Sequence, residues 1–275
     1  MHERFEFVLS SVEASVTGQA LGADVRRFPL RLRNTTTDPD RLVKLTSAVG
    51  KALVERGLAT TSSVHPAVRA AFGLFARHRV GVAVTGIDGF GENIAALSLT
   101  DGAQALGVTQ HGQSDDLLFS LFSDDDLVDV VAGVLPTMPA APGGPLTVRG
   151  TVSSHATAWE ARKAAEQALD EEETHAFGSL AVASTVAAPR PARRGREPSA
   201  EERLREALAG PRLGGGYVTV SGHRAAPQTL SWLDTEDGRY LISTQQNQDE
   251  CVATYEPAGQ ADVARAVRDA LSRAY

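Results

Sequence analysis

The sequence is poor in sulfur and in aromatic side chains. Cys251 is the one cysteine among 275 residues, so the chain has neither a disulfide framework nor a cluster of thiolates for zinc. Aromatic residues make up only 5% of the chain, but 42% hydrophobic residues are enough to bury a substantial core. We therefore expect a soluble protein of a reducing compartment, with the cytoplasm as its location.

Long hydrophobic runs and an excess of basic residues are also missing. The first seven residues, MHERFEF, mix acid and base where a secretion signal requires an apolar stretch, and no later segment reaches membrane-spanning length. The 34 acidic residues outnumber the 27 basic ones, which gives a net charge of −7. Because nucleic-acid binding needs a basic surface, we expect neither a nucleic-acid partner nor membrane insertion.

Motifs that would carry catalysis are absent from the sequence. The run Gly86-Ile-Asp-Gly-Phe-Gly91 looks like a phosphate-binding loop, but no lysine follows it and no helix is predicted after it. There is no G-x-S-x-G sequence, and the histidines do not fall at metal-ligand spacing. The run 124–126 of three aspartates is better explained as negative charge at a helix start capped by Ser123 or Asp124. We expect no catalytic residue, no metal and no other cofactor.

What the sequence does contain is a repeat at a spacing of 136 residues. When 82–102 is placed on 218–238 without a gap, six positions are identical. They are Val82/Val218, Val84/Val220, Gly86/Gly222, Leu97/Leu233, Asp101/Asp237 and Gly102/Gly238. A duplicated block with no nucleophile, metal cluster or phosphate loop in either copy indicates a scaffold that offers a surface, and not a catalyst.

Each copy of the repeat predicts four strands followed by a helix. The expected strands are near 80–86, 93–99, 104–110 and 116–122 with a helix at 124–135, and near 216–222, 229–235, 239–245 and 250–256 with a helix at 259–273. Asp101-Gly102 and Asp237-Gly238 lie between strands, where a two-residue hairpin turn suits Asp and Gly. Hairpin meanders between helices predict an α+β fold with a mainly antiparallel sheet.

The other segments predict flanking elements and a division into halves. We expect strands at 5–9 and 28–33, an echo of 29–33 at 145–149, and helices at 38–57, 66–78, 155–173 and 199–209. The Pro/Gly/Ala-rich stretch 136–145 divides the chain into half-repeats, 1–139 and 140–275, which together are expected to form one compact unit. Residues 181–198 have too few large apolar groups to order themselves and predict a mobile loop.

Five residues of the C-terminal strands are candidates for binding a partner. They alternate with expected core residues and are therefore expected on an open face of the sheet. The candidates are Tyr217, Ser221, Trp232, Arg239 and Gln245. Two assignments stay open for Trp232, since core packing and an interface anchor both suit a tryptophan. Asp234 has no evident partner, and the strand's face is unsettled because Leu230 and Leu233 are three apart.

Three stretches are specific enough to compare with known families. They are the opening Phe5-Glu-Phe-Val-Leu-Ser10, the helix end Ala52-Leu-Val-Glu-Arg-Gly-Leu58, and Asp234-Thr235 followed by Gly238-Arg-Tyr-Leu241. In this order and spacing they resemble the EspG family, the cytosolic chaperones of ESX (type VII) secretion in mycobacteria and other actinobacteria. The resemblance covers nearly the whole chain. It implies a quasi-twofold fold in which a central sheet is flanked by helical bundles, in agreement with the duplication.

The resemblance also implies a function. A member of this family would be a non-catalytic chaperone that binds the tip of a PE/PPE-like helical heterodimer, shields its apolar end and delivers it to the type VII secretion machinery. Two other classes stay open: a small-molecule hydrolase or transferase with a site between the two halves, and an adaptor for a different secreted helical pair. The sequence also leaves open which pair is bound and whether the free protein forms a homodimer.

Overall fold

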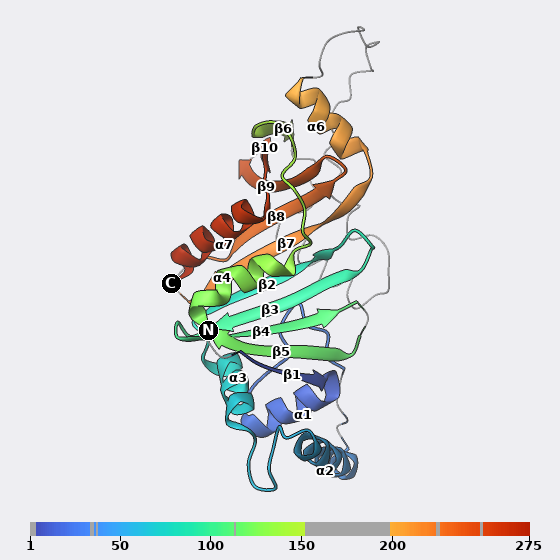
Figure 1. Cartoon of the computed structure of the whole chain (residues 1–275), viewed down its shortest axis with the longest axis vertical. Helices are drawn as coiled ribbons and strands as arrows, with labels where there is room; N and C mark the ends of the chain where they lie inside the picture. The colour runs from blue at the N-terminus through green and yellow to red at the C-terminus, as the bar shows by residue number, and fades with distance from the viewer. Residues whose placement is uncertain are drawn as a thin grey trace.

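One antiparallel sheet of ten strands forms the body of the protein. The structure, a computed structural model, describes residues 4–33, 36, 38–112, 114–151, 199–223, 226–247 and 250–275. Across the sheet the strands follow the order β1-β5-β4-β3-β2-β7-β8-β9-β10-β6 (Figure 1). Every neighbouring pair is antiparallel. The sheet and its covering helices confirm the predicted α+β class.

The bounds of the elements are as follows. The strands are β1 Phe5–Ser10, β2 Val80–Ile87, β3 Asn93–Thr100, β4 Gln104–His111, β5 Asp116–Ser123, β6 Leu146–Thr151, β7 Arg212–Gly222, β8 Gln228–Thr235, β9 Gly238–Asn247 and β10 Glu250–Pro257. The helices are α1 Ser11–Leu21, α2 Pro39–Glu55, α3 Pro66–Arg77, the 3₁₀-helix η1 Asp124–Asp126, α4 Leu127–Val134, α6 Ala200–Ala209 and α7 Gln260–Ala274.

All eight strands predicted from the repeat are present, but both turns differ from the prediction: the first is a longer loop, and the second lies one residue earlier than Asp237-Gly238. The connection between β3 and β4 spans residues 101–103, and the Asp101 carboxylate accepts hydrogen bonds from the N–H groups of Ala103 and Gln104, each at 3.0 Å. The predicted two-residue turn is therefore wrong at this position, because the Asp101 side chain closes a longer loop. Between β8 and β9 the connection is Glu236-Asp237, and Gly238 already pairs with Thr235.

The predicted strand at 28–33 is wrong. Leu30 and Leu32 pack against the core, as their alternation suggests, but the backbone between them bonds to a side chain instead of a strand. The N–H of Arg31 donates to Oε1 of Gln110 at 2.8 Å, and the carbonyl of Arg31 accepts from Nε2 at 3.0 Å. The side-chain amide of Gln110 satisfies both backbone hydrogen-bonding groups of Arg31, so Arg31 does not pair with a neighbouring strand. Strand β6 contains most of 145–149 and forms one edge of the sheet. The opposite edge is β1, and not 29–33, the segment that 145–149 was expected to echo.

Helix α1 was not predicted, because its apolar side chains do not repeat as a stripe. Its start is nevertheless encoded by a capping box. Ser10 Oγ accepts from the N–H of Glu13 at 3.3 Å, and the Glu13 carboxylate accepts from the N–H of Ser10 at 2.9 Å. The S-x-x-E spacing was the available signal.

Side-chain caps mark where several of the other described helices begin. Asp38 caps α2, whose first residue is Pro39, and Ser123 caps the aspartates of η1 that precede α4. Ser199 and Glu202 form a capping box at the start of α6. The helix expected at 155–173 and the loop expected at 181–198 lie outside the described residues. None of the described helices is long and apolar enough to cross a membrane.

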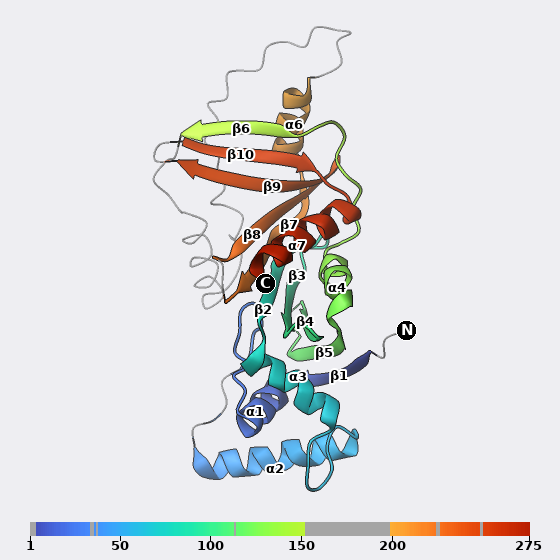
Figure 2. The same ribbon diagram turned by 90° about the vertical axis from the view of Figure 1, so that its left-hand side faces the viewer.

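Three apolar clusters cover different parts of the sheet. One joins α4 and α7 to the middle of one face, which we call the α4/α7 face. On the opposite face, α1, α2 and α3 pack at the β1 end, and α6 packs at the β6 end. Figures 1 and 2 show these helix groups at the middle and at the two ends of the molecule. Among the described residues, the opposite face of β2, β7 and β8 therefore lies between two helix-covered regions.

Candidate partner-binding surface

The middle of the sheet presents a band of side chains on the face opposite α4 and α7. These side chains alternate with the buried valines of β2 and β7, which face the helices. We call them the central band: Ala83, Thr85, Tyr217, Thr219, Ser221, Thr229 and Ser231. Each is half-buried or exposed, and none belongs to the clusters under α1 to α3 or under α6.

The central band carries no charged side chain, although 22% of the chain is charged. The sheet around β1 is different, since exposed Arg4, Glu6 and Asp116 gather there and Arg4 pairs with Glu6 at 2.8 Å. Charges are costly to remove from water, and the cores of protein interfaces are depleted in them. The composition of the central band is therefore that of a surface that becomes dehydrated on binding.

Hydroxyl groups supply the polar atoms of the central band. The Oγ1 atoms of Thr219 and Thr229 lie 3.3 Å apart across β7 and β8, and Ser221 Oγ donates to the carbonyl of Gly81 at 3.3 Å. Burial raises the pKa of Tyr217, so its phenol stays protonated and remains a donor. A hydroxyl can both donate and accept, which lets the band pair with either kind of backbone group.

One aromatic ring projects from the loop at the end of β2. Phe90 is 94% exposed, yet its loop is braced by Asp88. Oδ1 of Asp88 accepts from the N–H groups of Phe90 and Glu92, each at 2.9 Å, and the N–H of Asp88 donates to the carbonyl of Glu92 at 3.0 Å. From the sequence, this loop was rejected as a phosphate site and Phe90 was missed. An aromatic residue between two glycines at a hairpin tip was the available signal.

The structure brings two of the five predicted contact residues into the central band. Tyr217 and Ser221 lie on β7 with their side chains on the open face. Gln245 is exposed, but alternation along β9 places it on the α4/α7 face with Leu241. Trp232 and Arg239 are only 3% and 0% exposed, so the expected exposure is wrong for both.

Trp232 is a core residue because two glycines make room for its indole. It belongs to the cluster beneath α4 and α7. A Cβ atom on Gly216 would lie 2.5 Å from Cη2 of the indole, and one on Gly86 would lie 2.8 Å from Cζ2. Both distances are shorter than any tolerated contact, so these positions accept only glycine while the ring stays in place. The core alternative for Trp232 is therefore confirmed.

Arg239 holds the Pro/Gly/Ala-rich stretch that begins at Pro136, which we call the connector. Its Nε donates to Oδ1 of Asp234 at 2.6 Å, and its Nη2 donates to Oδ2 of Asp234 at 2.8 Å and to the carbonyl of Pro136 at 2.7 Å. The N–H of Arg239 donates to the carbonyl of Pro139 at 2.8 Å, and its carbonyl accepts from Ala258 at 3.0 Å. Asp234, for which the sequence offered no partner, thus forms a buried bidentate ion pair.

The rings of His65, His78 and His223 contact backbone groups. Nδ1 of His65 caps α3 by accepting from the N–H of Ala67 at 3.2 Å. The rings of His78 and His223 lie 6.1 Å apart where β2 meets β7. Burial, and next the Arg27 guanidinium, lower the pKa of His78 below its ordinary value. The neutral ring is therefore the favoured form in the folded protein.

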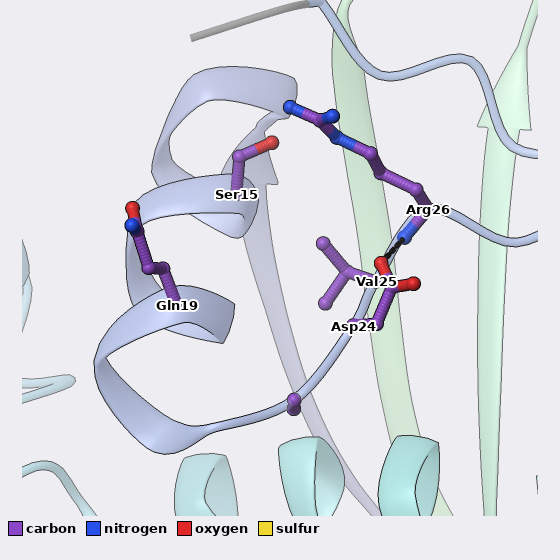
Figure 3. Close-up of a pocket in the computed structure, with 6 residues that line it drawn as sticks. Ser15, Gln19, Asp24, Val25 and Arg26 are labelled. Atoms are coloured by element: carbon purple, nitrogen blue, oxygen red, sulfur yellow. Dashed lines mark hydrogen bonds between the residues drawn. The ribbon is translucent and has the colours of Figure 1, made fainter. Parts of the chain in front are cut away.

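A shallow depression lies within the first half, away from the central band. Figure 3 shows Ser15 of α1 pointing toward the following loop, in which the N–H of Arg26 donates to Oδ1 of Asp24 at 3.0 Å. Gln19 of α1 also lines the depression. Ser15 Oγ donates to the carbonyl of Ser11 at 2.8 Å, so its proton is already used within α1. Within the described ranges no group of three or more His, Cys, Asp and Glu could hold a metal ion.

Comparison with known proteins places this arrangement among known folds. The sequence model of the EspG family matches residues 10–269. No match is found among curated proteins. Among solved structures, the chain is similar to the Mycobacterium tuberculosis type VII secretion system chaperone EspG5, in complex with the PE25–PPE41 dimer. The TM-score is 0.60 at 14% sequence identity, and the match covers 98% of this chain and 97% of that chain. At this identity the likeness establishes the fold.

Proposed function

Because this chain belongs to the EspG family, we propose that it is a non-catalytic chaperone that binds the tip of a PE/PPE-like helical heterodimer and delivers it to a type VII secretion system. The related EspG5 structure, in complex with a PE25–PPE41 dimer, supports a client of this kind. We also propose that the protein acts in the cytoplasm, since a chaperone must meet its client before export.

The observation that carries this proposal is the charge-free central band. An apolar helical tip can be dehydrated against Tyr217 and the hydroxyl-bearing strands without stripping water from a charge. Phe90 adds an exposed ring whose backbone is already ordered by Asp88, so little conformational entropy is lost when the ring inserts into a partner. We propose Tyr217 and Ser221 as contact residues together with Phe90.

The architecture of the proposed chaperone is a duplication. We propose that residues 1–139 and 140–275 are half-repeats related by a quasi-twofold axis, flanked by helical groups and joined in one compact unit. The pairing of β2 with β7 supports this arrangement. Val82 pairs with Val220 and Val84 pairs with Val218, while the sequence repeat equates Val82 with Val218 and Val84 with Val220. Exchange of the two strands therefore reproduces the same pairs.

Co-expression tests the proposed function. The chain is co-expressed with each PE/PPE-like pair encoded in its source genome, and with PE25–PPE41 as a non-cognate reference. Size-exclusion chromatography with light scattering then measures the mass of each complex. A ternary complex with at least one pair is expected, and Phe90→Ala should weaken it while leaving the melting temperature unchanged. Clean separation from every pair would contradict the proposal.

A further inference from the structure

We infer that the central band recognises its client through hydrogen bonds from its hydroxyl groups to backbone groups at the ends of the client's helices, and not through charge. The inference rests on the proposed function and defines the chemistry of the same surface. The feature of the client that is recognised is the set of unsatisfied N–H and C=O groups at a helix–loop–helix tip.

The tip of a helical pair has a particular chemistry. The first four N–H groups and the last four C=O groups of each helix have no partner within that helix. A surface that covers such a tip must supply both acceptors and donors, because an unpaired buried backbone group is costly. Hydroxyl groups meet both needs, whereas ammonium and carboxylate groups each meet only one.

The geometry of the central band suits this task. Thr85 pairs with Tyr217, and Tyr217 pairs with Ser231, which forms one cross-strand row of hydroxyls. Thr219 and Thr229 form the adjacent row. The hydrogen bond between these two hydroxyls uses only one of their two protons. The pair therefore keeps one donor and free lone pairs for an incoming group. Within each row the Cβ atoms lie at the cross-strand spacing of about 5 Å.

The absence of charge within the band has a consequence for specificity. Backbone groups are the same whatever side chains the client loop carries, so recognition through them tolerates variation in the loop sequence. A charged surface would instead select a complementary charge and would be screened by salt. The central band therefore fits neutral helical tips of one shape and varied sequence.

A matched pair of double variants tests the inference. Thr219→Val/Thr229→Val removes the band's hydroxyl pair while keeping β-branched side chains of nearly the same volume. Thr147→Val/Thr254→Val removes an equivalent pair, also 3.3 Å apart and also one exposed and one half-buried residue, on the α4/α7 face at the sheet edge. Both variants are compared with wild type by thermal melting and by titration of the heterodimer that co-purifies with the wild-type chain.

The expected result is an affinity about tenfold lower for the Thr219/Thr229 variant, from the loss of two hydrogen bonds at the interface, and an unchanged affinity for the Thr147/Thr254 variant. Wild-type affinity should change less than about twofold between ~0.1 and ~1 M NaCl, where the Debye length shrinks from about 10 to about 3 Å. If a complex forms but the two variants bind alike, or salt abolishes binding, the inference is wrong and the proposed function stands. If no heterodimer binds the wild type, both are overturned.

Discussion

Ala83 on β2 lies directly opposite Thr219 on β7, and Thr219 follows Ala83 by 136 positions. That separation equals the spacing of the sequence repeat, so in this ladder a residue pairs with its own counterpart in the second copy. A twofold axis relating two similar blocks would produce such a pair at its centre. The relationship supports the proposed duplication, which would put the central band at the junction of the proposed half-repeats.

Replacement of Trp232 by Ala should destabilise the fold, not merely the interface. The indole is 3% exposed and fills the space above two glycines, so its loss leaves a cavity that costs about 3–5 kcal/mol of unfolding free energy. Urea denaturation measures the loss. Phe90→Ala is the matched aromatic control, and it should stay within about 0.5 kcal/mol of wild type because its ring is exposed. Equal stabilities for the two variants would contradict the placement of Trp232.

Removal of the charge from Asp234 should destabilise the protein, because the buried Arg239 that holds the connector loses its carboxylate partner. Asp234→Asn leaves a buried guanidinium without its carboxylate, which should cost about 3–5 kcal/mol of stability by chemical denaturation. Arg41→Met, which breaks an exposed ion pair with Asp38, should change stability by less than about 1 kcal/mol. A comparably small effect of Asp234→Asn would show that the buried pair does not hold the connector.

Arg56 and Glu13 should prevent a strand of another molecule from pairing with the free edge of β1. Arg56 Nη1 donates to the carbonyl of Val8 at 2.9 Å, Glu13 accepts from the N–H of Ser10 at 2.9 Å, and the two side chains form an ion pair. Because these contacts occupy groups that another strand would need, Arg56→Met should promote self-association, measured by sedimentation velocity.

Arg33→Met is the control for the closed edge. It breaks the ion pair with Asp115, at 3.0 Å, without uncovering the carbonyl of Val8. Self-association of the Arg33 variant equal to that of Arg56→Met would mean that loss of charge, and not opening of the edge, is responsible.

Stability should fall as the pH drops below the ordinary histidine range. The folded-state pKa of His78 is lowered by burial and by Arg27, so the unfolded chain binds the proton more readily. The free energy of unfolding is therefore largest above pH 6.5 and decreases as the pH falls below that value towards the folded pKa. Urea midpoints at about pH 7.5 and about pH 5.5 measure the slope. His78→Gln should flatten it, and an unchanged slope would contradict this role of His78.

The strands of the two meanders could be predicted because a half-buried strand repeats every second residue. The positions of Trp232 and Arg239 could not, because each depends on partners from other elements. Gly86, which makes room for the indole, lies on β2, and the carbonyl of Pro136 lies in the connector. The pairing of Asp234 with Arg239 was also missed, because the expected turn at 237–238 would place Glu236 opposite Arg239, whereas the turn at 236–237 places Asp234 there.

The affinity of charge-insertion variants for a co-purified PE/PPE-like heterodimer tests the docking surface most directly. Thr229→Lys places a charge in the central band, and Thr147→Lys places the same charge on the α4/α7 face at the sheet edge. Burial of an unpaired ammonium is costly, so Thr229→Lys should reduce binding by about a hundredfold or more, while Thr147→Lys binds like wild type and both proteins melt normally. Wild-type affinity for Thr229→Lys would contradict the account.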